Sequence, residues 1–169
     1  MKLLLTTQIM DKNDPILGFF HRWVLEFAHH FERIDVICLK MGECDVPENV
    51  HIHSLGKEDG VSRIKYVRRF YRYFWSIYMN NNIDFVFFHM GAVMNVLAGP
   101  FFLIRKIKNT RFLWWKTHGH INILGRIALM CVDSVYTASA SSFPIESKKR
   151  KVVGHAIDVS MFNIAATQK

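Results

Sequence analysis

The sequence predicts an α/β protein with a Rossmann-like, doubly wound and mainly parallel sheet that carries helices on both faces. First, short β-rich runs alternate with segments of helix length along the 169 residues, and this alternation implies βαβ crossovers between parallel strands. Second, several strand candidates are almost continuously apolar, as strands covered on both faces must be. Half of the residues are hydrophobic and 21% are charged, a composition that supports one packed core and excludes a disordered protein.

The strand candidates are short, and the helix candidates lie between them. The strand candidates are residues 2–7, 34–39, 50–53, 85–88, 112–117 and 134–137. The helix candidates are residues 19–31, 62–79, 92–107 and 121–130. In a doubly wound sheet, ligands bind outside the carboxyl ends of the strands, so we look for function in the turns that follow them.

Residues 85–104 form a run of twenty residues without Asp, Glu, Lys or Arg, which is long enough for a membrane-spanning helix. Its parts point to another structure. Residues 85–88 have the pattern of a short buried strand, residues 89–91 that of a polar turn, and Gly99 with Pro100 would disturb a continuous helix. We predict a strand, a turn and a buried helix, with a transmembrane helix as the alternative.

The net charge of +8 is unevenly distributed. Residues 1–56 carry a net charge of −3 and residues 57–151 one of +11. A surface this basic suits nucleic acid, an anionic membrane or an anionic ligand, and simple solvation is the alternative. The three cysteines form no CxxC pair, and the apolar run after Lys2 is too short for a signal peptide, so we expect a cytoplasmic protein.

The turn after the first strand leads into a helix at Gly18. A glycine there lets a ligand approach the backbone, and a helix N-terminus favours an anion. Gly18 is therefore a candidate contact for a phosphate, with simple loop closure as the alternative. The sequence lacks GxGxxG after the first strand and GxxxxGK[ST] anywhere, so ordinary dinucleotide and P-loop sites lack their residues.

The fifth strand candidate ends in His118, Gly119 and His120. A histidine at the carboxyl end of a strand, followed by glycine, points into the ligand crevice and can bind a hydroxyl or act as acid or base. His118 is the first candidate for a ligand contact; His120 could do the same work, and capping of the next helix is the alternative. His89, at the end of the fourth strand, either lines the same crevice or is buried and satisfied by backbone.

The remaining polar candidates are weaker. Ser139 follows the last strand candidate, where its hydroxyl either binds ligand or caps the next turn. The other histidines have no Cys, Asp or Glu at ligand spacing, so we predict no metal site. The basic run at residues 148–151 is expected to be a solvated loop.

Cations alternate with aromatic residues between positions 63 and 78. On a helix, five side chains fall on one stripe that we expect to face the core. They are Ile64, Val67, Tyr71, Phe74 and Tyr78. Arg68, Arg69 and Arg72 then lie toward the rim, where arginine beside tyrosine and tryptophan suits an anionic bilayer or stacked nucleic-acid bases. A helix packed on the sheet with snorkelling arginines is the plain alternative.

Several motifs follow one another in an order that resembles a known family. The helix HRWVLEFAHHF is followed by RIDVICL, the run FLWWKTHG ends at Gly119, DSVYTAS begins at Asp133, and VVGHAIDVSMF covers residues 152–162. Together they resemble the N-terminal domain of retaining GT-B glycosyltransferases, the glycosyl transferases group 1. Two positions depart from the family pattern: Gly18 stands alone where a glycine pair is frequent, and His155 replaces an asparagine.

The resemblance implies a division of the chain and a mechanism. Residues 1–152 are expected to form the Rossmann-like, acceptor-side domain, and residues 153–169 to lead toward a C-terminal donor-binding domain that is absent. His118 is expected to contact the donor sugar, and Gly18 and Gly119 to approach the donor. Transfer with retention uses the departing nucleotide phosphate as the base, so neither a metal nor a cofactor besides the nucleotide-sugar substrate is expected.

Two function hypotheses follow. The first is the acceptor-binding domain of a glycosyltransferase that acts on a glycan or lipid-linked acceptor and is inactive without its C-terminal domain. The second is a non-catalytic basic module that uses Arg68, Arg69 and Arg72 to hold an anionic membrane or nucleic acid. Because a lipid-linked acceptor requires a membrane-facing surface, the two are compatible. We expect peripheral attachment on the cytoplasmic side and no nucleic-acid partner.

Overall fold

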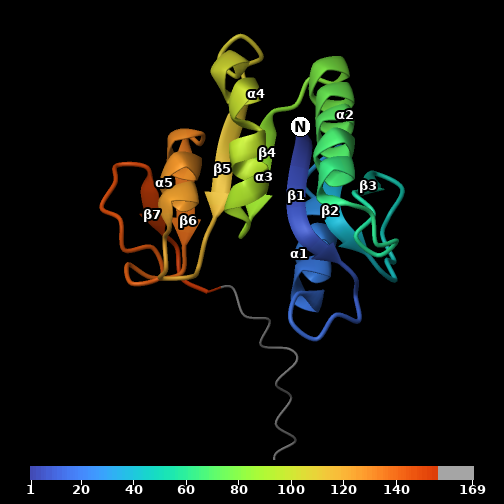
Figure 1. Cartoon of the computed structure of the whole chain (residues 1–169), viewed down its shortest axis with the longest axis horizontal. Coiled ribbons are helices and arrows are strands. Elements are labelled where there is room, and N and C mark those ends of the chain that lie inside the picture. The colour runs from blue at the N-terminus through green and yellow to red at the C-terminus, as the bar shows by residue number, and fades with distance from the viewer. Residues whose placement is uncertain (156–169) are drawn as a thin grey trace, which may run out of the picture.

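The computed structural model describes residues 1–155, which form one seven-stranded sheet between helices (Figure 1). The strands are β1 (Lys2–Met10), β2 (Arg33–Met41), β3 (Val50–Ser54), β4 (Phe85–His89), β5 (Arg111–Trp115), β6 (Ser134–Thr137) and β7 (Arg150–Val152). The helices are α1 (Gly18–Ala28), α2 (Arg63–Asn80), α3 (Ala92–Leu97), α4 (Gly99–Ile104) and α5 (Ile123–Met130). Every strand pair is parallel, which confirms the predicted α/β fold class.

The strand order is β3-β2-β1-β4-β5-β6-β7, so the direction of winding reverses between β1 and β4. There Leu3 pairs with Phe85 and Thr6 with Phe88. All carboxyl ends lie at one edge of the sheet, at the bottom of Figure 1. The turns after β1, β4 and β5 therefore meet beside the topological switch point, where doubly wound sheets bind ligands.

Both faces of the sheet are covered by apolar side chains, as the continuous strand patterns require. Helices α2 to α5 cover one face, where Phe74, Phe101 and Trp114 belong to one buried cluster (Figure 1). On the opposite face, Phe20 and Val24 of α1 pack in a second cluster with strands β1 and β2. Helices thus lie on both faces, as predicted.

The segment 85–104 folds as a strand, a turn and helices, which confirms the interpretation preferred over a transmembrane helix. The prediction of a single helix over residues 92–107 is wrong, because the chain forms two shorter helices, α3 and α4, that meet at Ala98. Pro100 has no N–H and its ring clashes with a preceding helical turn, so it begins a helix better than it continues one. None of the helices within residues 1–155 is long and apolar enough to cross a membrane.

Helix α2 buries Phe74 and Tyr78 of the predicted stripe but not its other three members. Its buried side chains are Phe70, Phe74, Ile77 and Tyr78. Ile64, Val67 and Tyr71 are exposed instead. The helix is aromatic on most sides, so packing against α4 decides its rotation, and the rings of Phe74 and Phe101 lie 4.5 Å apart.

The basic run at residues 148–151 is not only a solvated loop, because Arg150–Val152 pairs with β6 as the edge strand β7. Cationic side chains suit this position, since charge on an edge strand discourages pairing with another chain.

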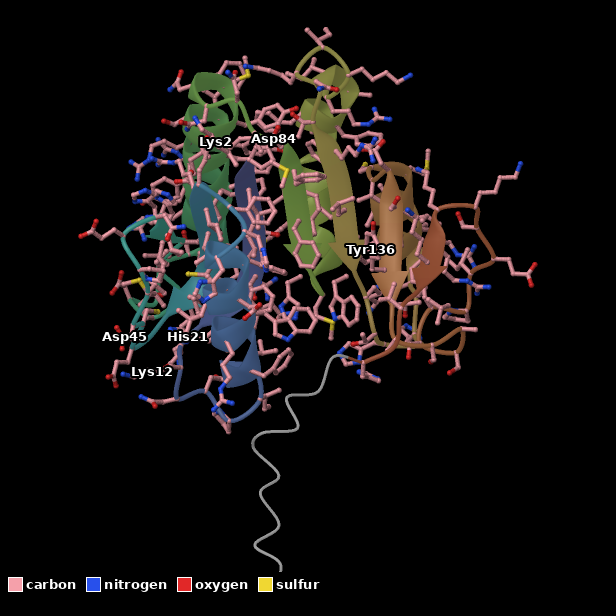
Figure 2. All side chains as sticks on the ribbon, turned by 180° about the vertical axis from the view of Figure 1, so that it is seen from behind. Lys2, Lys12, His21, Asp45, Asp84 and Tyr136 are labelled. Carbon is pink, nitrogen blue, oxygen red and sulfur yellow. The ribbon has the colours of Figure 1, made fainter. Side chains whose placement is uncertain are left out.

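Two aspartates hold the amino edge of the sheet, and each stands directly before a strand. Asp84, before β4, accepts a hydrogen bond from the backbone N–H of Lys2 in β1 at 2.7 Å (Figure 2). Asp133, before β6, accepts one from the N–H of Phe112 in β5 at 2.9 Å and another from Nε of Arg105 at 2.7 Å. Asp133 of the DSVYTAS motif therefore has a structural role.

Replacing Asp133 by alanine leaves Nε of Arg105 and the Phe112 N–H without their acceptor. Because hydrogen bonds to charged groups contribute about 1.5–3 kcal/mol, Asp133→Ala is expected to lower the free energy of unfolding by about 2 kcal/mol in urea denaturation. The matched control is Glu146→Ala, at an exposed carboxylate, with an expected change within about 0.5 kcal/mol. Equal effects of the two substitutions would contradict this role.

Candidate functional site

A cavity of about 420 Å³ lies at the carboxyl edge of the sheet, beside the switch point. The end of β1, the turn after β4, the segment after β5 and the start of α5 all contribute to its wall. Polar side chains reach it from each of these elements except the β4 turn. They are Gln8, Lys116, His118, His120 and Asn122. The cavity thus lies where the parallel sheet predicts a ligand crevice.

His118 and His120 both line this cavity and are exposed. Within residues 1–155, neither ring has a hydrogen-bond partner, so both can bind a ligand. Gly119, between the two histidines, lies close to the loop after β6. A Cβ added to Gly119 would lie 3.0 Å from the carbonyl oxygen of Ser141 in that loop. A side chain at this position would displace the loop, so the glycine permits the close approach that positions the two histidines.

Lys116 was not among the sequence candidates, although it directly follows β5 and stands two residues before His118. It is half-buried in the cavity wall, and burial lowers the pKa of its ammonium group. Among the described residues that line the cavity there is no carboxylate and no thiol. The site therefore offers cationic and neutral groups, which suit an anionic ligand.

His89 is buried rather than open to the cavity. Its Nδ1 lies 3.0 Å from the Thr7 hydroxyl oxygen in β1, and its ring stacks on Phe20 with a centroid distance of 3.8 Å. Burial lowers the pKa of the ring to about 3, so it is neutral at physiological pH. The following residues, Met90 and Gly91, do line the cavity. His89 joins β1 to β4 next to the site.

Gly18 and Ser139 do not line the cavity. The Gly18 N–H donates to the Asp14 carbonyl at 3.0 Å, and a Cβ on Gly18 would lie 3.0 Å from the carbonyl oxygen of Lys12. Ser139 accepts a hydrogen bond from the N–H of Ser142 at 3.1 Å. Both residues have local structural roles, and their contacts with a ligand stay predictions.

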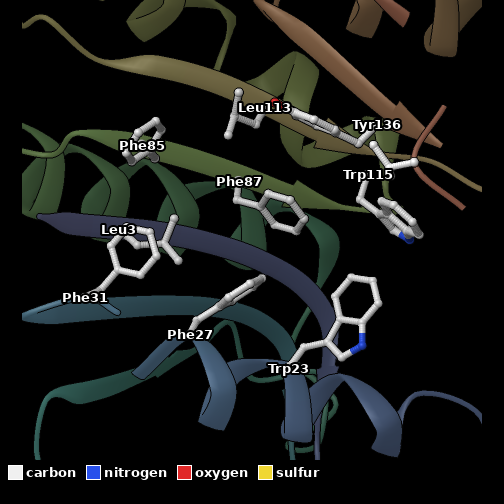
Figure 3. Close-up of a pocket in the computed structure, with 10 residues that line it drawn as sticks. Leu3, Trp23, Phe27, Phe31, Phe85, Phe87, Leu113, Trp115 and Tyr136 are labelled. Atoms are coloured by element: carbon white, nitrogen blue, oxygen red, sulfur yellow. The ribbon is translucent and has the colours of Figure 1, made fainter. Parts of the chain in front are cut away.

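A second concavity, of about 330 Å³, lies on the sheet face that carries α1 (Figure 3). Aromatic side chains from α1 and strands β4 to β6 dominate its lining. They include Trp23, Phe27, Phe85, Phe87, Trp115 and Tyr136. The rings of Trp23 and Trp115 meet edge to face at 5.2 Å. Among the described residues that line this groove none is charged, and Tyr136 contributes a phenol.

Arg68, Arg69 and Arg72 lie on α2, away from the lining of the 420 Å³ cavity. Arg68 and Arg72 are exposed, while Arg69 donates from Nη1 to the Leu55 carbonyl at 3.1 Å. Within the described part of the chain, no three His, Cys, Asp or Glu side chains converge on a position that could hold a metal ion. Independence from metal stays a prediction.

Comparison with known proteins finds similarity in structure alone. No protein-family model and no curated protein matches the sequence. The UDP-GlcNAc 2-epimerase of Methanocaldococcus jannaschii matches 91% of this chain with a TM-score of 0.57 and 11% identity, over 45% of its own length. Anabaena Alr3699/HepE in complex with UDP matches 96% with a TM-score of 0.55 and 13% identity, over 46% of its length.

The lipopolysaccharide outer core galactosyltransferase WaaB matches 94% of this chain with a TM-score of 0.56 and 11% identity, over 47% of its own length. At such low identities the likeness shows the fold, which is the Rossmann-like fold of one half of the GT-B proteins, as the resemblance predicted. The chain spans about half the length of the solved structures it matches.

The buried His89 gives a testable dependence of stability on pH. Between about pH 6.5 and pH 3 the unfolded chain binds a proton at this position and the folded chain does not. The free energy of unfolding therefore falls as the pH drops through this window, by up to about 1.4 kcal/mol per pH unit from this group. His89→Phe keeps an aromatic ring and is expected to remove this part of the slope.

Urea denaturation of both proteins between about pH 7 and pH 5 measures the two slopes. Thr7 loses a hydrogen-bond partner in the variant at every pH, so the informative quantity is the slope rather than the absolute stability. Parallel slopes for wild type and variant would rule out a buried neutral histidine.

Proposed function

We propose that this chain is the N-terminal, acceptor-side domain of a nucleotide-sugar-dependent glycosyltransferase. The observation that carries the proposal is the cavity at the switch point, which His118 and His120 line without partners in the described chain. The fold likeness to a galactosyltransferase and to a protein solved with UDP supports the same class of activity. The proposed substrates are a nucleotide-sugar and a glycan or lipid-linked acceptor.

The proposed division places the acceptor-side domain at residues 1–152 and the segment toward a donor-binding domain at residues 153–169. The chain turns directly after β7, where Gly154 has a φ of +80°. Residues 156–169, which include Asp158 and Phe162 of the family-like segment, lie outside the described residues. The match to about half of each similar structure supports a further domain, without which we propose that this chain is inactive.

In the proposed mechanism, His118 forms a hydrogen bond with a hydroxyl of the donor sugar, and Lys116 supplies positive charge toward the donor phosphates. As the resemblance to retaining GT-B enzymes implies, the leaving phosphate takes the proton of the acceptor hydroxyl, and the described cavity lining offers no carboxylate in its place. The bond from the sugar to the phosphate breaks while the bond to the acceptor oxygen forms on the same face, so the configuration is retained. This mechanism requires no divalent metal and no other cofactor.

We also propose that the protein attaches peripherally to the cytoplasmic side of a membrane, where a lipid-linked acceptor is presented. The exposed cations of α2, including Arg68 and Arg72, support this part of the proposal. Binding to nucleic acid is the competing use of the same cations.

A two-domain protein, made by joining this chain to a GT-B donor-binding domain, tests the transfer reaction. With a panel of nucleotide-sugars, His118→Ala is expected to lower kcat/KM by about 100-fold, because a hydrogen bond at the reacting sugar is lost. His30→Ala, at an exposed histidine in the turn after α1 and outside the cavity, is the matched control and is expected to leave transfer unchanged. Undiminished turnover of His118→Ala would remove this residue from its assigned role.

A further inference from the structure

Helix α2 exposes large apolar side chains and cations on the same outward side. Ile64 is 75% exposed and Trp75 60% exposed. Lys65, Arg68 and Arg72 lie at neighbouring positions of the helix, because residues three and four apart share one face. The helix contains no acidic residue, and none of these three cations has a carboxylate partner within residues 1–155. Their charge is therefore free to meet an anionic partner.

Helix α4 extends this surface. The ring of Trp75 lies 6.0 Å from that of Phe101 in α4, and Nζ of Lys108, beyond the end of α4, donates to the carbonyl of Met79 in α2 at 3.0 Å. These contacts hold the end of α4 beside α2, at the top of Figure 1. At this end Leu103 is 80% exposed and Ile107 is 87% exposed. We call Ile64, Lys65, Arg68, Arg72, Trp75, Leu103 and Ile107 the α2–α4 surface.

A solvated helix surface does not account for this combination. Single exposed apolar residues are common on soluble proteins, but apolar side chains gathered among unpaired cations mark an interaction surface. Tryptophan belongs at the level of lipid headgroups, long aliphatic side chains enter the acyl region, and Lys and Arg attract anionic headgroups. Leu103 and Ile107 cannot stack on bases as aromatic side chains do, which argues against a nucleic-acid site.

We propose that the α2–α4 surface binds the anionic surface of a lipid bilayer. This deepens the peripheral attachment in the proposed function by assigning it to particular residues, and it does not depend on sugar transfer. In α3, Val93 is also an exposed apolar residue of this helical layer, and it lines the cavity.

The test of charge uses the full chain and vesicles of phosphatidylcholine with phosphatidylglycerol. Co-sedimentation is expected with these vesicles and not with phosphatidylcholine alone, and it weakens as salt is raised. The double variant Arg68→Glu with Arg72→Glu is expected to bind at least about tenfold more weakly. Lys148→Glu with Lys151→Glu changes the net charge equally at exposed positions outside the surface, with an expected effect below about threefold.

The test of insertion uses tryptophan fluorescence. Trp75 is far more exposed than Trp114 and Trp115, at 60% against 0% and 8%. Anionic vesicles are expected to shift the emission to the blue, and brominated lipids to quench it, in the wild type and not in Trp75→Phe. Leu103→Ser with Ile107→Ser is expected to weaken binding about tenfold while the salt dependence stays unchanged.

Three results would overturn the proposal. One is equal binding to anionic and neutral vesicles, and another is an equal loss in the two charge-reversal variants. The third is binding to RNA, lost in Arg68→Glu with Arg72→Glu, without any binding to vesicles, which assigns the surface to nucleic acid instead. Circular dichroism of each variant checks that the fold is kept. None of these outcomes bears on sugar transfer by the two-domain protein in the absence of lipid. A failure of the membrane proposal is therefore distinguishable from a failure of the proposed transfer reaction.

Discussion

The pairing of β1 with β4 is the constraint on which the site depends. These strands begin more than eighty residues apart in the sequence, and a hydrogen bond joins them near each end of the pair. Asp84 binds the Lys2 N–H at the amino edge, and His89 binds the Thr7 hydroxyl near the carboxyl edge. Because the winding of the sheet reverses here, this pairing brings Gln8 and the turn after β4 into one cavity wall.

The histidines at the carboxyl edge divide into two kinds. His89 is buried, neutral and bonded to Thr7, and so it links β4 to β1. His118 and His120 lie one strand further along, where β5 has ended and Gly119 lets the chain pass close to the β6 loop. The two rings therefore face the cavity, and Lys116 adds positive charge beside them. A rigid sheet that presents unpartnered polar groups from its loops is the usual basis of a binding site.

The fold could be predicted because strands buried on both faces are apolar along their whole length, and that signal is local. Other features depend on contacts between distant residues. β1 extends through Gln8 to Met10 because it pairs with β2 as far as Met41, although Gln8 interrupts the apolar run. The rotation of α2 depends on Phe101, and the burial of His89 depends on Phe20. No spacing within one segment reveals such contacts, whereas His118 could be found because strand and turn are adjacent in sequence.

The central claim is that a nucleotide-sugar binds at the carboxyl edge of β1, β4 and β5. Titration of the two-domain protein with UDP- and GDP-sugars, with the isotope label confined to this chain and the response followed by NMR, tests it directly. The account predicts that the largest shifts occur at Gln8, Gly91 and residues 116–120, including the ring of His118. Shifts that gather in the aromatic groove beside Trp23 and Phe87, with none at residues 116–120, would contradict it.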